Sequence, residues 1–327
     1  MDTQLLTPPR MSAALADDTL LPPADVAYLT TVLVNVGFVG TPYAGGPLNE
    51  WVLIDAGIPM QASRIAAFAR ERFGDAPPRA ILLTHGHFDH VGSLHALLRR
   101  WPDTPVYAHR LEMPYLTGHS SYPPPDPSVG RGLMARTSPL FPNHPYNFRP
   151  NIAPLPADGV VPFLPDWRWI HTPGHSPGHV SFFRESDRTL IAGDAFVTQE
   201  QESLRGVMTM KHVLHGPPRY FTPDWVSAKA SVKALAALRP LYAITGHGLP
   251  VANPVLAHDL NLLAARFEEI AMPPDGRYVR HSAWSDETGT VWVPPAMPDW
   301  RPKIIAALAI TAAALAISWF ARSGKDD

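Results

Sequence analysis

The segment ILLTHGHFDHVG, residues 81–92, places metal-ligand side chains directly after an apolar run. His85, His87, Asp89 and His90 lie within six positions. Alternate residues of an extended chain point to the same side, so His85 and His87 can bind one ion. Asp89 and His90, where the chain turns into a helix, can face a neighbouring ion. This segment therefore predicts parts of two adjacent metal sites.

Three further segments repeat the pattern of a β-rich run followed by a ligand-type residue. They are HTPGHSPGH with His175, LIAGDAF with Asp194, and AITGHG with His247. The chain has no cysteine, which excludes disulfides, a thiolate nucleophile and cysteine-bound metals. Any metal must therefore be held by imidazole and carboxylate groups. We expect the four loops to meet at one edge of a sheet sandwich.

The hydrophobic pattern predicts the elements that position these loops. Glycine-punctuated β-rich runs at 28–40 and 51–57 indicate buried strands, and 167–196 indicates three more. Residues 61–74 place Ile65, Phe68, Ala69 and Phe73 on one helical face and end at Gly74, a typical C-cap. The segments 223–240 and 254–270 predict two further helices. This alternation of strands and helices indicates an α/β fold.

The chain divides into segments of different composition. We expect a flexible N-terminal arm at 1–25, a main domain at 26–272, and a hairpin with a linker at 273–300. Residues 113–166 are rich in proline and aromatic residues, and such a long irregular stretch inside a domain predicts a lid. A hydrophobic helix is expected at 301–322.

The motifs THGHFDH, TPGHSPGH, GD and TGHG, in this order, resemble the metallo-β-lactamase superfamily, in particular its glyoxalase II-like branch, over about residues 28–270. The resemblance implies an αββα sandwich. It also implies that His85, His87 and His175 hold a first metal, that Asp89, His90 and His247 hold a second, and that Asp194 bridges them. Asp55 in LIDAG would support the site from behind the ligands.

Such a site implies hydrolysis of an ester, lactone or thioester in a small-molecule substrate. Two metal ions would supply hydroxide at neutral pH, and Asp89 would orient it as well as bind metal. Histidine and aspartate ligands favour two Zn²⁺ ions per chain, although iron fits them too. The residues leave the substrate open: the aromatic side chains of the lid could cover an apolar acyl group or could simply pack on the sandwich.

Two other functions remain open at this point. A mononuclear iron persulfide dioxygenase of the same superfamily would use the positions of His85, His175 and Asp194. A membrane-tethered binding module could have inherited the site without its catalysis. For His179 we expect a structural role, and for His95, His109, His144 and His258 a surface or capping role.

Charge and hydropathy indicate the partners of the chain. A formal net charge of -2 argues against nucleic acid, which requires a basic surface. The uncharged run 304–320, flanked by basic residues, would extend over about 25 Å as a helix, close to the ~30 Å of a bilayer core. This predicts a C-terminal membrane anchor, with the catalytic domain in the cytoplasm.

Overall fold

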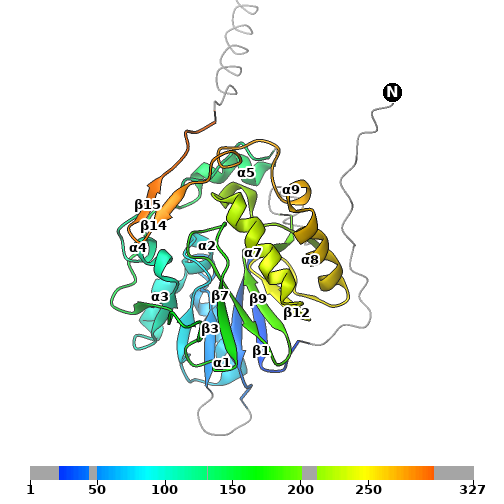
Figure 1. Cartoon of the computed structure of the whole chain (residues 1–327). Coiled ribbons are helices and arrows are strands. Elements are labelled where there is room, and N and C mark those ends of the chain that lie inside the picture. The colour runs from blue at the N-terminus through cyan, green and yellow to red at the C-terminus, as the bar shows by residue number, and fades with distance from the viewer. Residues whose placement is uncertain (1–21, 44–49, 131, 201–211, 298–327) are drawn as a thin grey trace, which may run out of the picture. The chain divides into compact units, whose positions relative to one another are not determined.

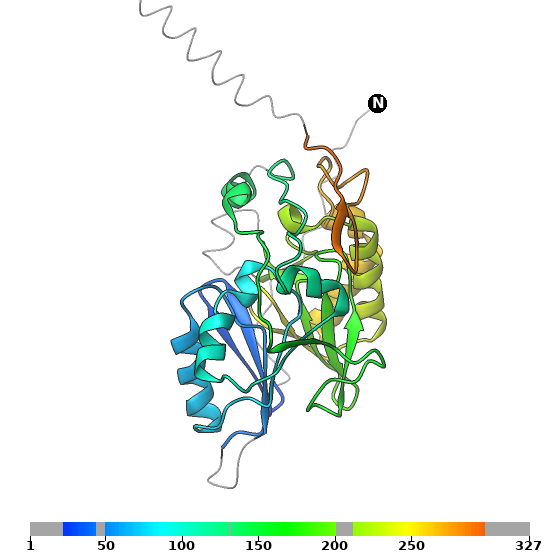
Figure 2. The ribbon, with the colours of Figure 1, turned by 90° about the vertical axis from the view of Figure 1, so that its left-hand side faces the viewer.

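Two β-sheets lie face to face in the computed structural model, which describes residues 22–43, 50–130, 132–200 and 212–297. Helices cover the outer face of each sheet, so the layers follow in the order helix, sheet, sheet, helix (Figures 1 and 2). This confirms the predicted αββα sandwich.

The first sheet contains the strand that leads to the histidine-rich segment. Its strands run in chain order: β1 (Val26–Thr31), β2 (Val34–Gly40), β3 (Trp51–Ile54), β4 (Ala80–Leu82), β5 (Val106–Ala108) and β6 (Ile152–Pro154). The first three are antiparallel, whereas β3, β4, β5 and β6 pair in parallel. The carboxyl ends of β3 and β4 therefore lie at the same edge.

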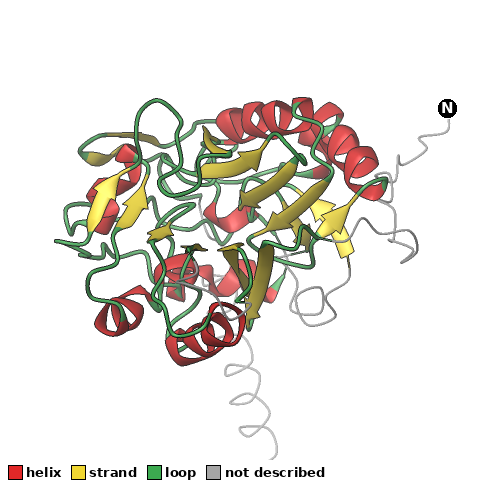
Figure 3. Cartoon of the chain, turned by 90° about the horizontal axis from the view of Figure 1, so that it is seen from below, coloured by secondary structure: helices red, strands yellow, loops and turns green. Residues whose placement is uncertain are grey.

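The second sheet brings the other ligand loops to this edge. Its order is β13 (Val251–Ala252), β12 (Tyr242–Thr245), β9 (Thr189–Gly193), β8 (Val180–Arg184) and β7 (Trp167–His171). Strands β9 and β12 are parallel, with Gly193 opposite Thr245. Asp194 and His247 consequently leave the sheet on the same side. Figure 3 shows the two sheets facing one another between the helices.

Four helices form the outer layers: α1 (Ala62–Phe73) and α3 (Leu94–Arg100) on the first sheet, α7 (Trp225–Ala237) and α8 (Val255–Ala265) on the second. Helix α1 buries Ile65, Ala69 and Phe73 as predicted, and leaves Phe68 half-buried. It ends at Gly74, whose φ of 77° and N–H bond to the Arg70 carbonyl form the expected C-cap.

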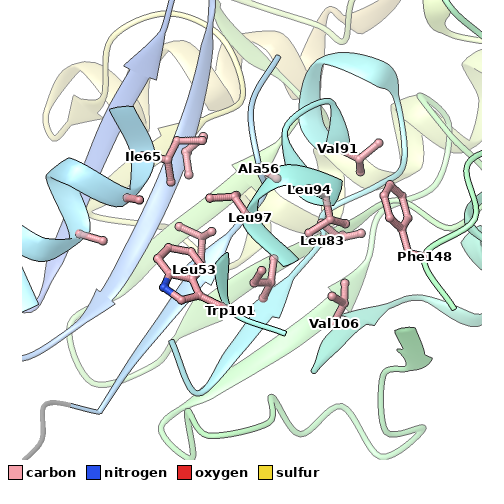
Figure 4. Close-up of a cluster of buried hydrophobic side chains, with 14 of the residues drawn as sticks. Leu53, Ala56, Ile65, Leu83, Val91, Leu94, Leu97, Trp101, Val106 and Phe148 are labelled. Atoms are coloured by element: carbon pink, nitrogen blue, oxygen red, sulfur yellow. The ribbon is translucent and has the colours of Figure 1, made fainter. Parts of the chain in front are cut away.

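The hydrophobic core has one layer between the sheets and one beneath each helical layer. Between the sheets, Ile54 and Leu82 of the first sheet pack with Phe182 and Ile244 of the second. Figure 4 shows the layer beneath α1 and α3, where Leu53 and Leu83 face Leu97 and Trp101. Alternate residues of the same strands thus serve two core layers, which explains why these strands are apolar throughout.

The lid segment, residues 113–166, is less irregular than its proline content predicts. It contains α4 (Met113–Leu116), α5 (Leu133–Thr137), the 3-10 helix η2 (Ser138–Leu140) and the edge strand β6. Part of the segment therefore belongs to the sandwich, because β6 pairs with β5 and buries Ile152.

The remaining elements are η1 (Arg110–Glu112), α2 (Phe88–Val91), η3 (Arg219–Phe221), α9 (Phe267–Ile270), the pair β10 (Val197–Gln199) and β11 (His212–His215), and the hairpin of β14 (Trp284–Asp286) and β15 (Gly289–Trp292).

The predicted membrane anchor has to be corrected. Among the residues that the structure describes, no helix combines the length and apolarity needed to cross a bilayer. The run 304–320, and with it the helix expected at 301–322, lies outside these residues, as does the arm up to residue 21. The run is also shorter than a bilayer core and rich in alanine, a weakly apolar residue. The membrane-anchored localisation with a cytoplasmic domain is therefore withdrawn.

Candidate metal centre

Four loops at one edge of the sandwich bring the seven predicted ligand residues together. The first follows β4 and runs into α2, and the others follow β7, β9 and β12. Their ligand atoms form three groups, and within each group all lie within 4.8 Å of one another: His85, His87 and His175; His85, His90 and Asp194; and Asp89, His90 and His247. All of these side chains are buried except Asp89, which is partly exposed. We call the first set the three-histidine group and the last the mixed group.

In the three-histidine group, side chains from two loops meet directly. His87 Nδ1 lies 2.9 Å from His175 Nε2. The His85 ring packs edge-on against both rings, with centroids 4.7 and 4.8 Å away. The three imidazoles therefore converge on one small volume although 88 residues separate His87 from His175.

Asp194 lies between the two groups. Its Oδ2 is 3.4 Å from His175 Nε2, 3.5 Å from His90 Nε2 and 3.2 Å from His247 Nε2. His247 Nε2 is also 3.4 Å from Asp89 Oδ2. One carboxylate oxygen thus faces histidines from both groups, as the predicted bridging role of Asp194 would require.

Residues behind the ligands orient their rings. Asp55 Oδ2 lies 2.8 Å from His90 Nδ1, and the same carboxylate accepts the backbone N–H and the hydroxyl of Thr84. His247 Nδ1 lies 2.9 Å from the Leu33 carbonyl. Because carboxylate and carbonyl oxygens only accept, His90 and His247 carry hydrogen on Nδ1 and turn Nε2 toward Asp194.

His179 has the structural role that the sequence predicts. Its Nε2 accepts the backbone N–H of Asp194 at 2.9 Å, and its Nδ1 lies 2.8 Å from the Thr172 hydroxyl. Both ring nitrogens are therefore used. His109 also fits its expected role, because it caps η1 by accepting the N–H of Leu111.

The two groups differ in electrostatics. Burial lowers the pKa of His85 and His175 well below the ordinary value and that of His87 to about 4. These rings are neutral at pH 7 and keep a lone pair for a cation. Burial also acts on His247, but the charge of Asp194 raises its pKa to about 10. Burial opposes ionisation of Asp194 too, yet His247 and His90 hold the pKa of this carboxyl well below its usual value.

These residues fit metal ions. Buried His85 Nε2 and Asp194 Oδ1 have no hydrogen-bond partner among the described residues. An unpartnered buried polar atom is costly, and a bound cation would remove this cost. Imidazole and carboxylate suit zinc and also iron, so the donor set does not choose between them.

One buried residue beside the site was missed by sequence reasoning. Glu112 is fully buried at the end of η1 and accepts hydrogen bonds from both histidine-bearing loops. Its only signal in the sequence is a glutamate among apolar residues in RLEMPYL, a pattern that an exposed turn also produces.

An aromatic wall, formed by Phe88, Phe141, Tyr220 and Phe221, borders the three-histidine group. The Phe221 ring stacks on His87 at 4.8 Å and contacts Phe88 and Phe141 at 6.4 and 6.1 Å. Val129 and Ala135 of the lid segment pack in the same cluster. The lid thus contributes apolar surface next to the ligands.

Comparison with known proteins identifies the class of the protein. Residues 29–247 match the family model of the metallo-beta-lactamase superfamily. The chain therefore belongs to this superfamily, and it is an enzyme of the metallo-hydrolase type. The probable metallo-hydrolase YflN of Bacillus subtilis (strain 168) is 48% identical over 243 residues, which cover 74% of this chain and 90% of that relative.

Two further similarities define how far the comparison reaches. The crystal structure of the BLEG-1 B3 metallo-beta-lactamase aligns with this chain at a TM-score of 0.52 and 22% sequence identity. The alignment covers 73% of this chain and 99% of that chain, and it shows a similarity of fold. The hydroxyacylglutathione hydrolase of Xylella fastidiosa (strain M23) is 31% identical over 117 residues, 36% of this chain and 32% of that protein. The match to this hydroxyacylglutathione hydrolase is therefore only partial, whereas the match to the superfamily extends over most of the chain.

Proposed function

We propose that the enzyme hydrolyses an ester, lactone or thioester with two metal ions. His85, His87 and His175 would hold one ion, Asp89, His90 and His247 the other, and Asp194 both. The observation that carries this proposal is the set of converging ligand groups: within each group, the ligand atoms lie within 4.8 Å of one another. When bound, two ions supply hydroxide at neutral pH and stabilise a developing oxyanion.

The protein residues prepare the site for this reaction. The lowered pKa values of the three-histidine group keep each ring neutral, with one unprotonated nitrogen, at neutral pH. Asp89 is the partly exposed ligand of the mixed group. Burial disfavours its charge, but its hydrogen bond with His247 lowers its pKa, so it stays ionised. Asp89 can therefore accept a hydrogen bond from the attacking water and orient it.

The mixed group favours hydrolysis over the persulfide dioxygenase reaction. A single iron held by His85, His175 and Asp194 would leave Asp89 and His247 without a ligand role. Yet Asp89 Oδ2 and His247 Nε2 lie only 3.4 Å apart. A purely binding role would not require two converging ligand groups either.

The aromatic wall supports an apolar acyl group as the part of the substrate beside the metals. Phe221 stacks on His87, a member of the three-histidine group. Each CH₂ of an acyl chain that is buried against this wall would contribute about 0.8 kcal/mol of binding free energy. If the transition state keeps this contact, kcat/KM rises roughly fourfold for each CH₂.

Metal analysis and a substrate panel test the reaction. Purified protein should contain close to two ions per chain, and ester, lactone and thioester substrates should be hydrolysed until a chelator removes the metal. Oxygen uptake with a persulfide substrate that follows iron content, without any hydrolysis, would contradict the proposal and favour the dioxygenase.

A series of p-nitrophenyl esters with acyl chains of increasing length tests the substrate class. The wild-type kcat/KM should rise with chain length, and Phe221→Ala should flatten this rise. The effect of the substitution is measured as the ratio of kcat/KM for long-chain esters to kcat/KM for short-chain esters. Loss of metal would lower both values alike and leave this ratio unchanged. Phe163→Ala, which removes a half-exposed ring stacked on Arg79, is the matched control. A flat wild-type series would reject the apolar acyl group but not the hydrolase.

A further inference from the structure

Glu112 connects the two loops that carry the three-histidine group. Its Oε2 accepts the backbone N–H of Gly86, between His85 and His87, at 2.9 Å. Its Oε1 accepts the Ser176 hydroxyl at 2.7 Å and the Gly178 N–H at 2.8 Å. Ser176 directly follows His175. One carboxylate therefore holds both loops next to their ligands.

The two oxygens of the Glu112 carboxylate accept the same number and kinds of hydrogen bonds. Each oxygen accepts one backbone N–H and one hydroxyl, since the Tyr122 hydroxyl donates to Oε2 beside Gly86. Glu112 is fully buried, and hydrogen bonds to a buried charged group contribute more than neutral ones. This arrangement holds the spacing of two loops that lie far apart in the sequence, one at Gly86 and the other at Gly178.

The two backbone donors are glycines because nothing larger fits. A Cβ at Gly178 would lie 2.8 Å from the backbone nitrogen of Glu112, and one at Gly86 would lie 2.4 Å from the Tyr122 hydroxyl. Both distances are below contact. The close approach of Gly178 to Glu112, and of Gly86 to the Tyr122 hydroxyl beside it, therefore requires the absence of a side chain.

The lid segment joins the same junction. Besides its bond to Glu112, the Tyr122 ring packs against His87 at 4.7 Å and stacks on Tyr115 at 4.0 Å. In contrast, Glu112 forms no hydrogen bond with Asp89, His90 or His247, the described residues of the mixed group, and the outer partners of His90 and His247 are Asp55 and the Leu33 carbonyl.

We propose that Glu112 is a positioning residue for the three-histidine group: it holds the loop of His85 and His87 against the loop of His175, and it does not support the mixed group. The part of this inference that concerns metal binding rests on the proposed function. Substitution should weaken the ion at the three-histidine group about 10–100-fold, as for other residues behind metal ligands, and leave the second ion nearly unchanged.

Glu112→Gln tests this with almost no change in volume. The side-chain NH₂ cannot accept, so whichever way the amide is turned, the N–H of Gly86 or of Gly178 faces a donor. The hydroxyls of Ser176 and Tyr122 can rotate to compensate, whereas a backbone N–H cannot. One of the two loops must therefore lose its attachment.

The experiment compares wild type, Glu112→Gln and Asp259→Asn. Asp259 is a matched control, because it is a fully buried carboxylate on α8, paired with His258 at 2.9 Å. Hydrogen exchange of the metal-free proteins is measured at residues 84–90 and 174–180. Zinc affinity is measured by competition with a chelator, and the visible spectrum of the Co²⁺-loaded proteins reports ligand geometry.

Glu112→Gln should speed exchange in at least one of the two loops, weaken one zinc ion selectively and alter the Co²⁺ spectrum, while Asp259→Asn changes none of these. Ser176→Ala, which deletes one donor, should act in the same direction by a smaller factor and keeps the test open if Glu112→Gln does not fold. Unchanged exchange in both loops, or equal weakening of both ions, overturns the inference. A wild type that binds no metal would refute the proposed function, while the exchange measurement would still decide whether Glu112 holds the loops.

Discussion

Replacing Asp55 by asparagine should impair the metal centre by reversing the tautomer of one ligand. Asp55 has a φ of 62°, a left-handed conformation that asparagine tolerates, so Asp55→Asn keeps the backbone. The Thr84 N–H, 2.8 Å from Oδ1, holds the amide oxygen in place. The new NH₂ then faces His90 Nδ1 at the position of Oδ2. His90 Nδ1 must accept, and its hydrogen moves to Nε2, the nitrogen that faces Asp194.

The size of the effect follows from the contacts that change. The variant loses one hydrogen bond to a charged group, worth about 1.5–3 kcal/mol, and blocks a ligand nitrogen until the tautomer reverts. This agrees with the ~10–100-fold loss of metal affinity found when partners behind ligands are removed. The loss should be larger for the ion of the mixed group, because His90 belongs to it.

Chelator competition with zinc measures this effect for both ions, with Asp259→Asn as the control for a buried aspartate outside the site. Equal unfolding midpoints of the metal-free proteins would show that the fold is intact. If Asp55→Asn binds both ions as tightly as wild type does, the tautomer argument is refuted, and Asp55 has only a packing role.

Three further predictions concern the site and the fold. His87→Ala should remove the ion of the three-histidine group and, with it, the activity, whereas His95→Ala should change neither; two ions per chain retained in the first variant, measured by elemental analysis, would contradict the ligand set. Trp51→Ala should lower the free energy of unfolding in urea by about 3–5 kcal/mol, because the buried indole stacks on Phe73 at 4.8 Å; a loss below ~1 kcal/mol would contradict this. Burial acts to raise the pKa of Asp187, but the hydrogen bond with Arg184 outweighs burial, and the pKa is lowered overall. The ionised Asp187 therefore stabilises the fold above its ordinary pKa, and this stabilisation is lost as the pH falls through the lowered pKa. Asp187→Asn should therefore make unfolding midpoints less dependent on pH below ~4, by under 1 kcal/mol because the pair is partly exposed; an unchanged acid slope would argue against it.

The alternation of strands and helices could be predicted from the sequence because it depends on local backbone geometry, whereas the full ligand set was implied by the resemblance of the ordered motifs to the superfamily. The alternation of an extended chain, in the loop that follows β4, places His85 and His87 on the same side, and the helical period places Ile65 and Phe73 on the buried face of α1. The run 304–320 shows the limit of such reasoning, because a local hydropathy pattern predicted a membrane anchor that no described helix provides.

Tertiary structure alone decided which distant groups meet. His247 contacts the Leu33 carbonyl 214 residues away, and Glu112 bonds to two loops that share no local pattern with it. These contacts depend on the registers of two sheets and on how closely the sheets pack, which are set by side chains throughout the core. A buried glutamate and an exposed one look the same in a sequence, because burial is a property of the packed chain and not of the residue.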